Sequence, residues 1–207
     1  MTRFICFFTL ILSAGLWPAG CASRTSLNSQ QQSFLLETTP GTQRQPLPIA
    51  GILKIRHCRA ATPFDGQYFL YRTQAGQYQQ DFYKLFLTPP NEQITELLRA
   101  WLKQSGAFRG VLPASSTASP DYVLEPLLSA IYSDFSEPTQ PKTVLKMHVV
   151  FLKADKNEQS SRVVMEKTYE TIEPMQNNTG QDVIKNYNLS LEKVLAQLQS
   201  DLVSALQ

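Results

Sequence analysis

The stretch 184–206, IKNYNLSLEKVLAQLQSDLVSAL, is the clearest secondary-structure signal in the chain. Its apolar residues recur every three or four positions, which predicts a helix with one buried face. Asp182 precedes the stretch and suits the positive end of a helix dipole. A helix of about 25 residues is roughly 37 Å long, enough to cross a whole sheet. The residues on its apolar face are Ile184, Tyr187, Leu191, Val194, Leu195, Leu198, Leu202, Ala205 and Leu206.

Three segments with the composition of strands precede this helix. They cover residues 122–135, 144–152 and 162–172, and each is rich in β-branched or aromatic residues. The short polar connection at 154–157 predicts that the second and third segments pair antiparallel. Pro126 has no backbone N–H, so it predicts an edge position or a bulge in the first.

The first half of the chain supplies the remaining elements. Two aromatic-rich runs, 67–72 and 77–83, flank a short Gly-containing connection and predict a hairpin. Pro89-Pro90-Asn91 is predicted to open a helix, because Pro is tolerated in the first turn and Asn can cap, and Ser105-Gly106 is predicted to end it. With strands at 52–58 and 108–112, the order becomes β-β-β-α-β-β-β-β-α. This order predicts an α/β fold, a mixed β-sheet with helices packed on its faces.

The N-terminus has the pattern of an export signal. Arg3 precedes a mostly apolar run over residues 4–16, shorter than the roughly 20 residues that span a bilayer as a helix. Ala19-Gly20-Cys21 follows and resembles the bacterial lipobox, which implies cleavage before Cys21 and attachment of lipid to its sulfur. The alternative is an ordinary signal peptide with an incidental cysteine. Ala22 follows Cys21 where the inner-membrane retention signal has Asp, which favours the periplasmic face of the outer membrane.

These features divide the chain into three parts. We expect a signal peptide over 1–20, a lipidated N-terminus and flexible tether over 21–49, and a single domain over 50–207. The tether is predicted because residues 22–49 are rich in Ser, Thr, Gln and Pro without a clear helix or strand period. In the mature chain Cys58 is then the remaining thiol, predicted to be free on a buried strand, with a reactive or intermolecular thiol as the alternative.

Composition excludes several classes of protein. The chain has 207 residues, 43% of them hydrophobic, which suits one folded domain and excludes wholesale disorder. Lys and Arg number 19 and Asp and Glu 17, giving a net charge of +2. A chain so close to neutral lacks the basic surface that binds phosphate backbones, so we expect no nucleic-acid partner.

The sequence also lacks common catalytic motifs. It has neither a Gly-rich phosphate loop ending in Lys-Ser or Lys-Thr nor a G-x-S-x-G elbow. The sequence has two histidines, which limits both catalytic triads and metal sites. We expect His148 to be a half-exposed strand residue, and His57 and Cys58 to point to opposite faces of a strand. We therefore expect no enzyme activity, no metal site and no cofactor.

Several stretches in order along the chain resemble the ABC-type transport auxiliary lipoprotein family. They are Pro63-Phe64-Asp65-Gly66, Phe69-Leu70-Tyr71-Arg72, Tyr78, Asp81-Phe82-Tyr83, Phe86-Leu87, Pro89-Pro90, Leu97, Trp101-Leu102, Ser105-Gly106-Ala107-Phe108, Asp121-Tyr122-Val123-Leu124 and Tyr132-Ser133-Asp134-Phe135. The resemblance implies a mixed sheet with packed helices, loosely like the N-terminal domain of TolB. It also implies work with an MCE-domain protein and an ABC permease and ATPase in moving lipids between bacterial membranes, without catalytic residues.

The aromatic hairpin is the candidate binding feature. Phe64, Tyr71, Arg72 and Tyr78 are predicted as possible partner-docking residues, since aromatic residues and Arg are enriched at interface hot spots. The alternative is that the aromatic residues are core, and that Arg72 forms an ion pair with Asp81 across the hairpin. The core alternative covers Phe64, Tyr71, Phe82, Tyr83 and Trp101.

Three functions remain open from the sequence. The leading hypothesis is a non-catalytic, outer-membrane auxiliary lipoprotein that docks an MCE-type partner and helps hydrophobic molecules cross the envelope. A second is a periplasmic carrier that holds a lipid between the sheet and the long helix. A third is a structural envelope protein that forms a homo-oligomeric collar.

Overall fold

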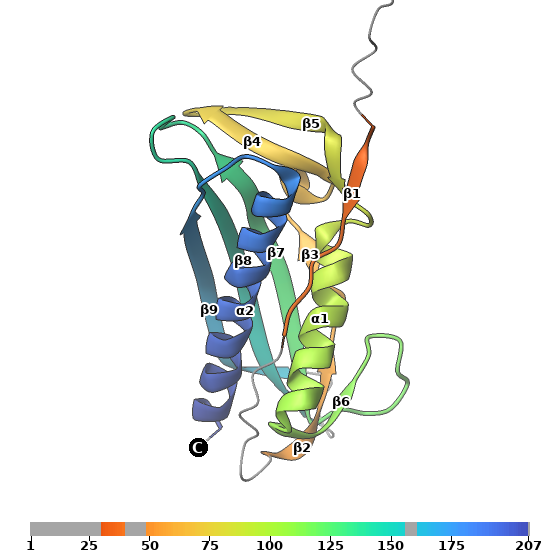
Figure 1. Ribbon diagram of the computed structural model, residues 1–207. Coiled ribbons are helices and arrows are strands. Elements are labelled where there is room, and N and C mark those ends of the chain that lie inside the picture. The colour runs from red at the N-terminus through yellow and green to blue at the C-terminus, as the bar shows by residue number, and fades with distance from the viewer. Residues whose placement is uncertain (1–29, 40–48, 156–160, 207) are drawn as a thin grey trace, which may run out of the picture.

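The computed structural model describes residues 30–39, 49–155 and 161–206, and these form one mixed sheet with two α-helices (Figure 1). The predicted lipidation residue Cys21 and the predicted signal peptide over 1–20 lie outside the described residues. The elements are β1 Gln32–Phe34, β2 Ile49–Ile55, β3 Arg59–Ala60, the short 3₁₀ helix η1 Thr62–Phe64, β4 Tyr68–Gln74, β5 Gln77–Phe86, α1 Pro90–Ser105, β6 Phe108–Leu112, β7 Tyr122–Asp134, β8 Lys142–Ala154, β9 Ser161–Pro174 and α2 Gly180–Ser204.

Strand β7 organises the sheet. It pairs antiparallel with β8 along its length, and its other side pairs parallel with β2, β3 and β4 in turn. β9 extends the antiparallel side, and the β4–β5 hairpin extends the parallel side, where β1 adds parallel to β5. The predicted mixed sheet, hairpin and antiparallel pair of late strands are confirmed.

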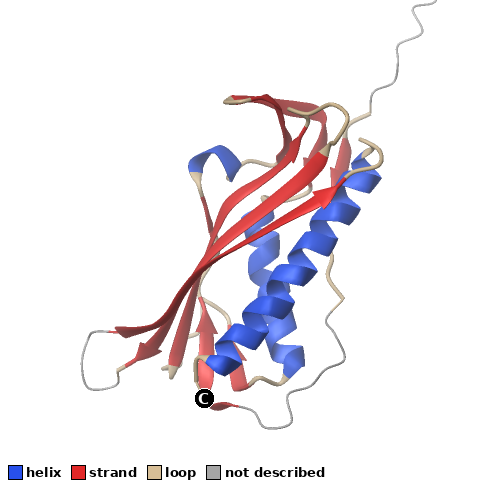
Figure 2. Ribbon diagram, turned by 90° about the vertical axis from the view of Figure 1, so that its left-hand side faces the viewer, coloured by secondary structure: helices blue, strands red, loops and turns tan. Residues whose placement is uncertain are grey.

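Both helices pack on the same side of the sheet (Figure 2), not on its two faces. They lie beside each other, and Trp101 Nε1 in α1 donates to Gln199 Oε1 in α2 at 2.8 Å. One layer is enough because the most apolar side chains of the long strands point to one side. In the described part of the chain, η1 alone among the helices lies against the other side, which we call the uncovered face.

The core fills the space between the sheet and these helices. Tyr187 in α2 is fully buried, and its ring lies 6.0 Å from the rings of Phe69 and Phe86. Its hydroxyl lies 3.3 Å from Ser133 Oγ, a partner that offsets the cost of burying a polar group. Other fully buried residues on this side include Leu53, Leu98, Leu124, Leu145, Phe151, Leu191, Leu195 and Leu198.

The helix boundaries agree with the sequence signals. α1 begins at Pro90 and ends before Gly106, whose φ of 65° is the left-handed conformation that favours glycine. α2 begins after Thr179, whose side-chain oxygen accepts from the backbone N–H of Asp182 at 3.2 Å. It spans 25 residues, as its predicted length requires.

The predicted flexible tether over 21–49 is wrong for residues 30–39. β1 pairs with β5, Leu36 is buried, and the Leu36 backbone N–H donates to Gln93 Oε1 at 2.6 Å. The ring of Phe34 packs so closely on Gly180 that an added Cβ would lie 2.7 Å from its Cε2. A strand of three residues is too short to show the alternation of apolar and polar residues that predicts a strand. Contacts with residues distant in the sequence therefore hold β1 in place.

Two local expectations also need correction. The edge position expected from Pro126 is wrong, because β7 is central. The strand does have an irregularity, but it lies between Leu128 and Ala130 and not at Pro126. Pro126 falls between the residues that pair with β2 and those that pair with β3, where a missing N–H removes no partner on that side. Cys58 follows β2 in a short connection, although it is buried and free as predicted. Burial raises the pKa of its thiol to about 12, so at neutral pH the thiol stays protonated, which favours the free, unreactive alternative.

Candidate functional site

An aromatic cluster gathers around Tyr132 on the uncovered face. Phe64 stacks on Tyr132 with ring centres 6.1 Å apart, and Tyr78 meets Tyr132 edge-on at 5.4 Å. The Arg72 guanidinium carbon lies 5.4 Å from the centre of the Tyr132 ring, on its face. We call Phe64, Arg72, Tyr78 and Tyr132 the Tyr132 cluster.

Strand alternation explains how these residues meet. Successive side chains of a strand point to opposite faces, so Phe69 enters the core while Leu70 and Arg72 face outward. Arg72 pairs in register with Tyr78 on one side, which places their side chains on the same face. On the other side β4 runs parallel to β7, and Arg72 pairs with Asp134, two residues after Tyr132.

A buried ion pair supports the cluster from beneath. The Arg72 guanidinium donates to the Asp134 carboxylate, whose side chain is only 1% exposed. Ser136 donates twice to the same carboxylate, from its backbone N–H at 3.0 Å and its hydroxyl at 2.7 Å. Burial by itself would raise the pKa of Asp134, but the hydrogen bonds from Arg72 and Ser136 outweigh it and lower that pKa to about 2.

The predicted ion pair between Arg72 and Asp81 is wrong. Asp81 accepts from the Tyr71 hydroxyl at 2.5 Å and lies 3.5 Å from Lys84 Nζ. The cause is a shift of register in the hairpin, which sets Asp81 opposite Phe69 and leaves Arg72 facing Tyr78.

Tyr71 is separated from the other predicted docking residues. It points to the helix side, where its ring meets Phe135 edge-on at 5.5 Å, and burial together with Asp81 raises the pKa of its hydroxyl above the ordinary value. The structure thus brings together Phe64, Arg72 and Tyr78 and places Tyr71 elsewhere. Docking by any of them stays a prediction.

The aromatic surface continues from the cluster along the hairpin. Phe82 is 66% exposed and meets Tyr68 edge-on at 5.8 Å, and Tyr78 is also exposed. The expectation that Phe82 and Tyr83 are core is wrong, whereas Trp101 is buried as expected. We call Tyr68, Tyr78 and Phe82, with the Tyr132 cluster, the aromatic surface; its exposed rings are Tyr68, Tyr78 and Phe82, whereas the Tyr132 ring is buried.

Sequence reasoning missed Tyr132 and Tyr68 as members of this surface. Tyr132 lies in a strand whose side chains alternate between the two faces, and Asp134, two residues later, is on the same face. This spacing indicates that an aromatic and an acidic side chain lie close together. That signal becomes specific only when β4 is known to lie beside β7.

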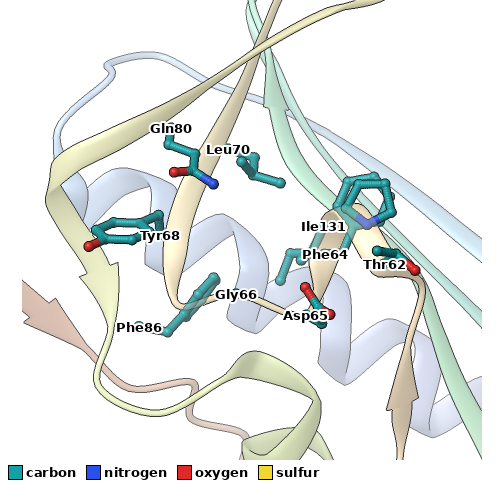
Figure 3. A pocket seen from close by; sticks show the side chains of 10 residues that line it. Thr62, Phe64, Asp65, Gly66, Tyr68, Leu70, Gln80, Phe86 and Ile131 are labelled. Atoms are coloured by element: carbon teal, nitrogen blue, oxygen red, sulfur yellow. The ribbon is translucent and has the colours of Figure 1, made fainter.

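Pockets formed by the described residues lie beside the sheet. One of about 160 Å³ lies between η1 and the β4–β5 hairpin, next to the aromatic surface (Figure 3). Another, of about 650 Å³, lies between β9 and α2. Two of its lysines are paired with carboxylates, Lys167 with Asp201 and Lys193 with Glu173, both at 2.7 Å.

The described residues hold no group of three or more His, Cys, Asp or Glu side chains placed to bind a metal ion. His148 is a partly exposed strand residue, as predicted, and its Nδ1 lies 3.1 Å from Thr168 Oγ1. Neither α1 nor α2, the α-helices of the described part, has the combined length and apolar character needed to cross a membrane.

The fold is similar to that of several solved structures. The crystal structure of protein XCC0632 from Xanthomonas campestris, assigned to family DUF330, matches with a TM-score of 0.72 and 17% identity, over 84% of this chain and 96% of its own. An uncharacterized protein matches at 0.59 with 14% identity, over 86% and 99%. The hypothetical protein CT253 from Chlamydia trachomatis matches at 0.52 with 8% identity, over 76% and 98%.

At such identities the shared feature is the fold. No family model and no curated protein matches the sequence.

Proposed function

We propose that the chain is a non-catalytic lipoprotein on the periplasmic face of the outer membrane. In this role it is the auxiliary component of an ABC transport system and docks an MCE-domain protein, while a separate permease and ATPase supply transport and energy. The system would move lipids or other hydrophobic molecules across the envelope. The lipobox at Ala19-Gly20-Cys21 and the family resemblance support the location and the partner.

The observation that carries the proposal is the aromatic surface on the uncovered face. Tyr and Phe are large and rigid, and they lose little conformational entropy when a partner covers them. Phe82 exposes most of its side chain, although burying a Phe is favourable by about 1.5–3 kcal/mol. An apolar surface that the fold leaves open is best explained by a protein partner that covers it.

The ion pair beneath the surface makes the docking role more specific. Arg72 is fixed by Asp134, and Asp134 in turn by Ser136, so the Tyr132 ring packs against an ordered guanidinium. A preorganised surface loses less entropy on association than a mobile one.

We prefer docking to the lipid-carrier hypothesis because the space between the sheet and α2 is already filled by side chains. The space between the sheet and α2 is occupied by buried side chains such as Val149, Leu195 and Tyr187. The pocket between β9 and α2 is lined by paired charges as well as apolar groups, which suits an acyl chain poorly.

Photo-crosslinking in bacterial envelopes tests the proposal. A photoreactive phenylalanine analogue in place of Phe82 should crosslink an MCE-domain protein. The matched control carries the analogue at Leu189, which is also exposed but lies on α2. Equal crosslinking from both positions, or no MCE-domain protein in the product from position 82, would refute the proposed docking.

Labelling with palmitate tests the anchor separately. The unmodified chain should incorporate the label, and Cys21→Ser should lose all of it, because the thiol is the proposed acylation site. Full labelling of the Ser variant would place the lipid elsewhere.

A further inference from the structure

The pocket beside η1 has the size of a single side chain. Its volume is about 160 Å³, and apolar groups of Phe64, Leu70, Phe86 and Ile131 line it. A cavity of about 150 Å³ lined by aliphatic and aromatic groups holds one benzene molecule. The pocket therefore accommodates one Phe- or Leu-sized group and is too small for a lipid.

The polar groups that line the pocket make no side-chain hydrogen bond or ion pair with other described residues. They belong to Thr62, Asp65, Tyr68 and Gln80, which contribute to its wall. In Figure 3 the Asp65 carboxylate and the Gln80 amide lie on opposite sides of the pocket. The pocket thus combines an apolar interior with one uncompensated negative charge.

The pocket is continuous with the aromatic surface. Phe64 belongs both to the pocket wall and to the Tyr132 cluster, and Tyr68 belongs both to the wall and to the exposed pair with Phe82. A partner that covers the aromatic surface therefore also covers the pocket.

We propose that this pocket receives one apolar side chain of the docked partner, and that a lysine or arginine next to that side chain pairs with Asp65. Arg72, the cation of the neighbouring cluster, is paired with Asp134, and among the described residues no ion pair involves Asp65. A long basic side chain can also lay its methylene groups over the Tyr68 ring. The inference deepens the proposed function, because it rests on a partner docking at this surface and names the chemistry of the docked segment.

Three small molecules, each with a phenyl ring but with different charges, test the charge preference of the pocket without any partner protein. Benzylammonium, benzyl alcohol and phenylacetate are titrated into the full chain in detergent micelles, with carbon-13 labels on the Ile and Leu methyl groups. The methyl signals of Leu70 and Ile131 report occupation of the pocket. Benzylammonium should bind about two- to fivefold more tightly than benzyl alcohol, the range of a partly exposed ion pair, and phenylacetate more weakly than both.

Variants assign the effect to the pocket. Asp65→Asn should make benzylammonium and benzyl alcohol bind equally, whereas Glu137→Gln, which removes an exposed carboxylate that does not line the pocket, should change nothing. Gly66→Leu should abolish binding of all three probes, because a Cβ added there meets open space and the side chain can enter the pocket. Asp65 is exposed, so its Asn variant folds like the unmodified chain and keeps the test decisive if Gly66→Leu does not fold.

Equal affinity for the three probes in the unmodified chain, or unchanged methyl shifts in Gly66→Leu, would overturn the inference. The titration is independent of the crosslinking experiment. A cation preference without any crosslink from position 82 would refute the transport partner and leave the pocket assignment standing. A crosslink from position 82 without probe binding would refute the pocket assignment and leave the transport partner standing.

Discussion

The two faces of the sheet use aromatic residues in different ways. On the helix side, Phe69, Phe86 and Tyr187 pack against one another and are buried. On the uncovered face, Tyr132 and Phe64 are held by an ion pair and by other rings, and Tyr78 and Phe82 reach solvent. The helix side therefore supplies stability, whereas the uncovered face keeps apolar area exposed, and this is the face where we propose that a partner docks.

Removing a core side chain on the helix side should have the largest effect. Leu195→Ala is expected to lower the free energy of unfolding by about 2–5 kcal/mol. The variant loses the free energy gained by burying the deleted methyl and methylene groups, and it leaves a cavity under α2. Denaturant unfolding of the purified protein measures the change. Leu189→Ala, on the exposed side of the same helix, should stay within about 0.5 kcal/mol.

Crowding the contact between β1 and α2 should cost less. Gly180→Ala places a Cβ against the ring of Phe34, and overpacking of this kind costs about 1–3 kcal/mol. Hydrogen exchange should show faster exchange of the Leu36 amide, which donates to Gln93. Gly66→Ala, where an added Cβ meets nothing within 4 Å, is the matched control and should leave exchange unchanged.

The ion pair between Arg72 and Asp134 should make the free energy of unfolding depend on pH in acid. Because the folded pKa of Asp134 is about 2, below its ordinary 3.8, its stabilisation is complete above pH 4 and declines as the pH falls toward 2. Asp134→Asn should lower the free energy of unfolding at neutral pH by about 1–2 kcal/mol and flatten this acid dependence. An unchanged acid profile in the variant would show that other carboxylates cause it.

Changing an exposed ring should affect stability least. Phe82→Ser is expected to shift the free energy of unfolding by less than about 0.5 kcal/mol, because the side chain is already in water. Co-purification of the partner should nevertheless fall sharply. A large loss of stability with normal partner binding would reverse the roles assigned to the two faces.

Local signals predicted the regular elements well, since each signal lies within the element itself. The period of residues 184–206 and the prolines and glycine around α1 depend on neighbours three or four positions away, so they can be read from the chain. β1 and the position of Pro126 in a central strand depend on pairing with distant strands. Such pairing carries no short-range signal.

By itself the sequence determined the α/β class, the mixed sheet, both helices, the buried free Cys58 and an aromatic hairpin with candidate binding residues. Tertiary structure alone decided that both helices share one side, that Arg72 meets Asp134 instead of Asp81, and that Tyr71 leaves the surface that Phe64 and Tyr78 share. The physical reason is register. A small shift in how β4 meets β5 and β7 changes which side chains are neighbours, while each strand keeps its own alternation.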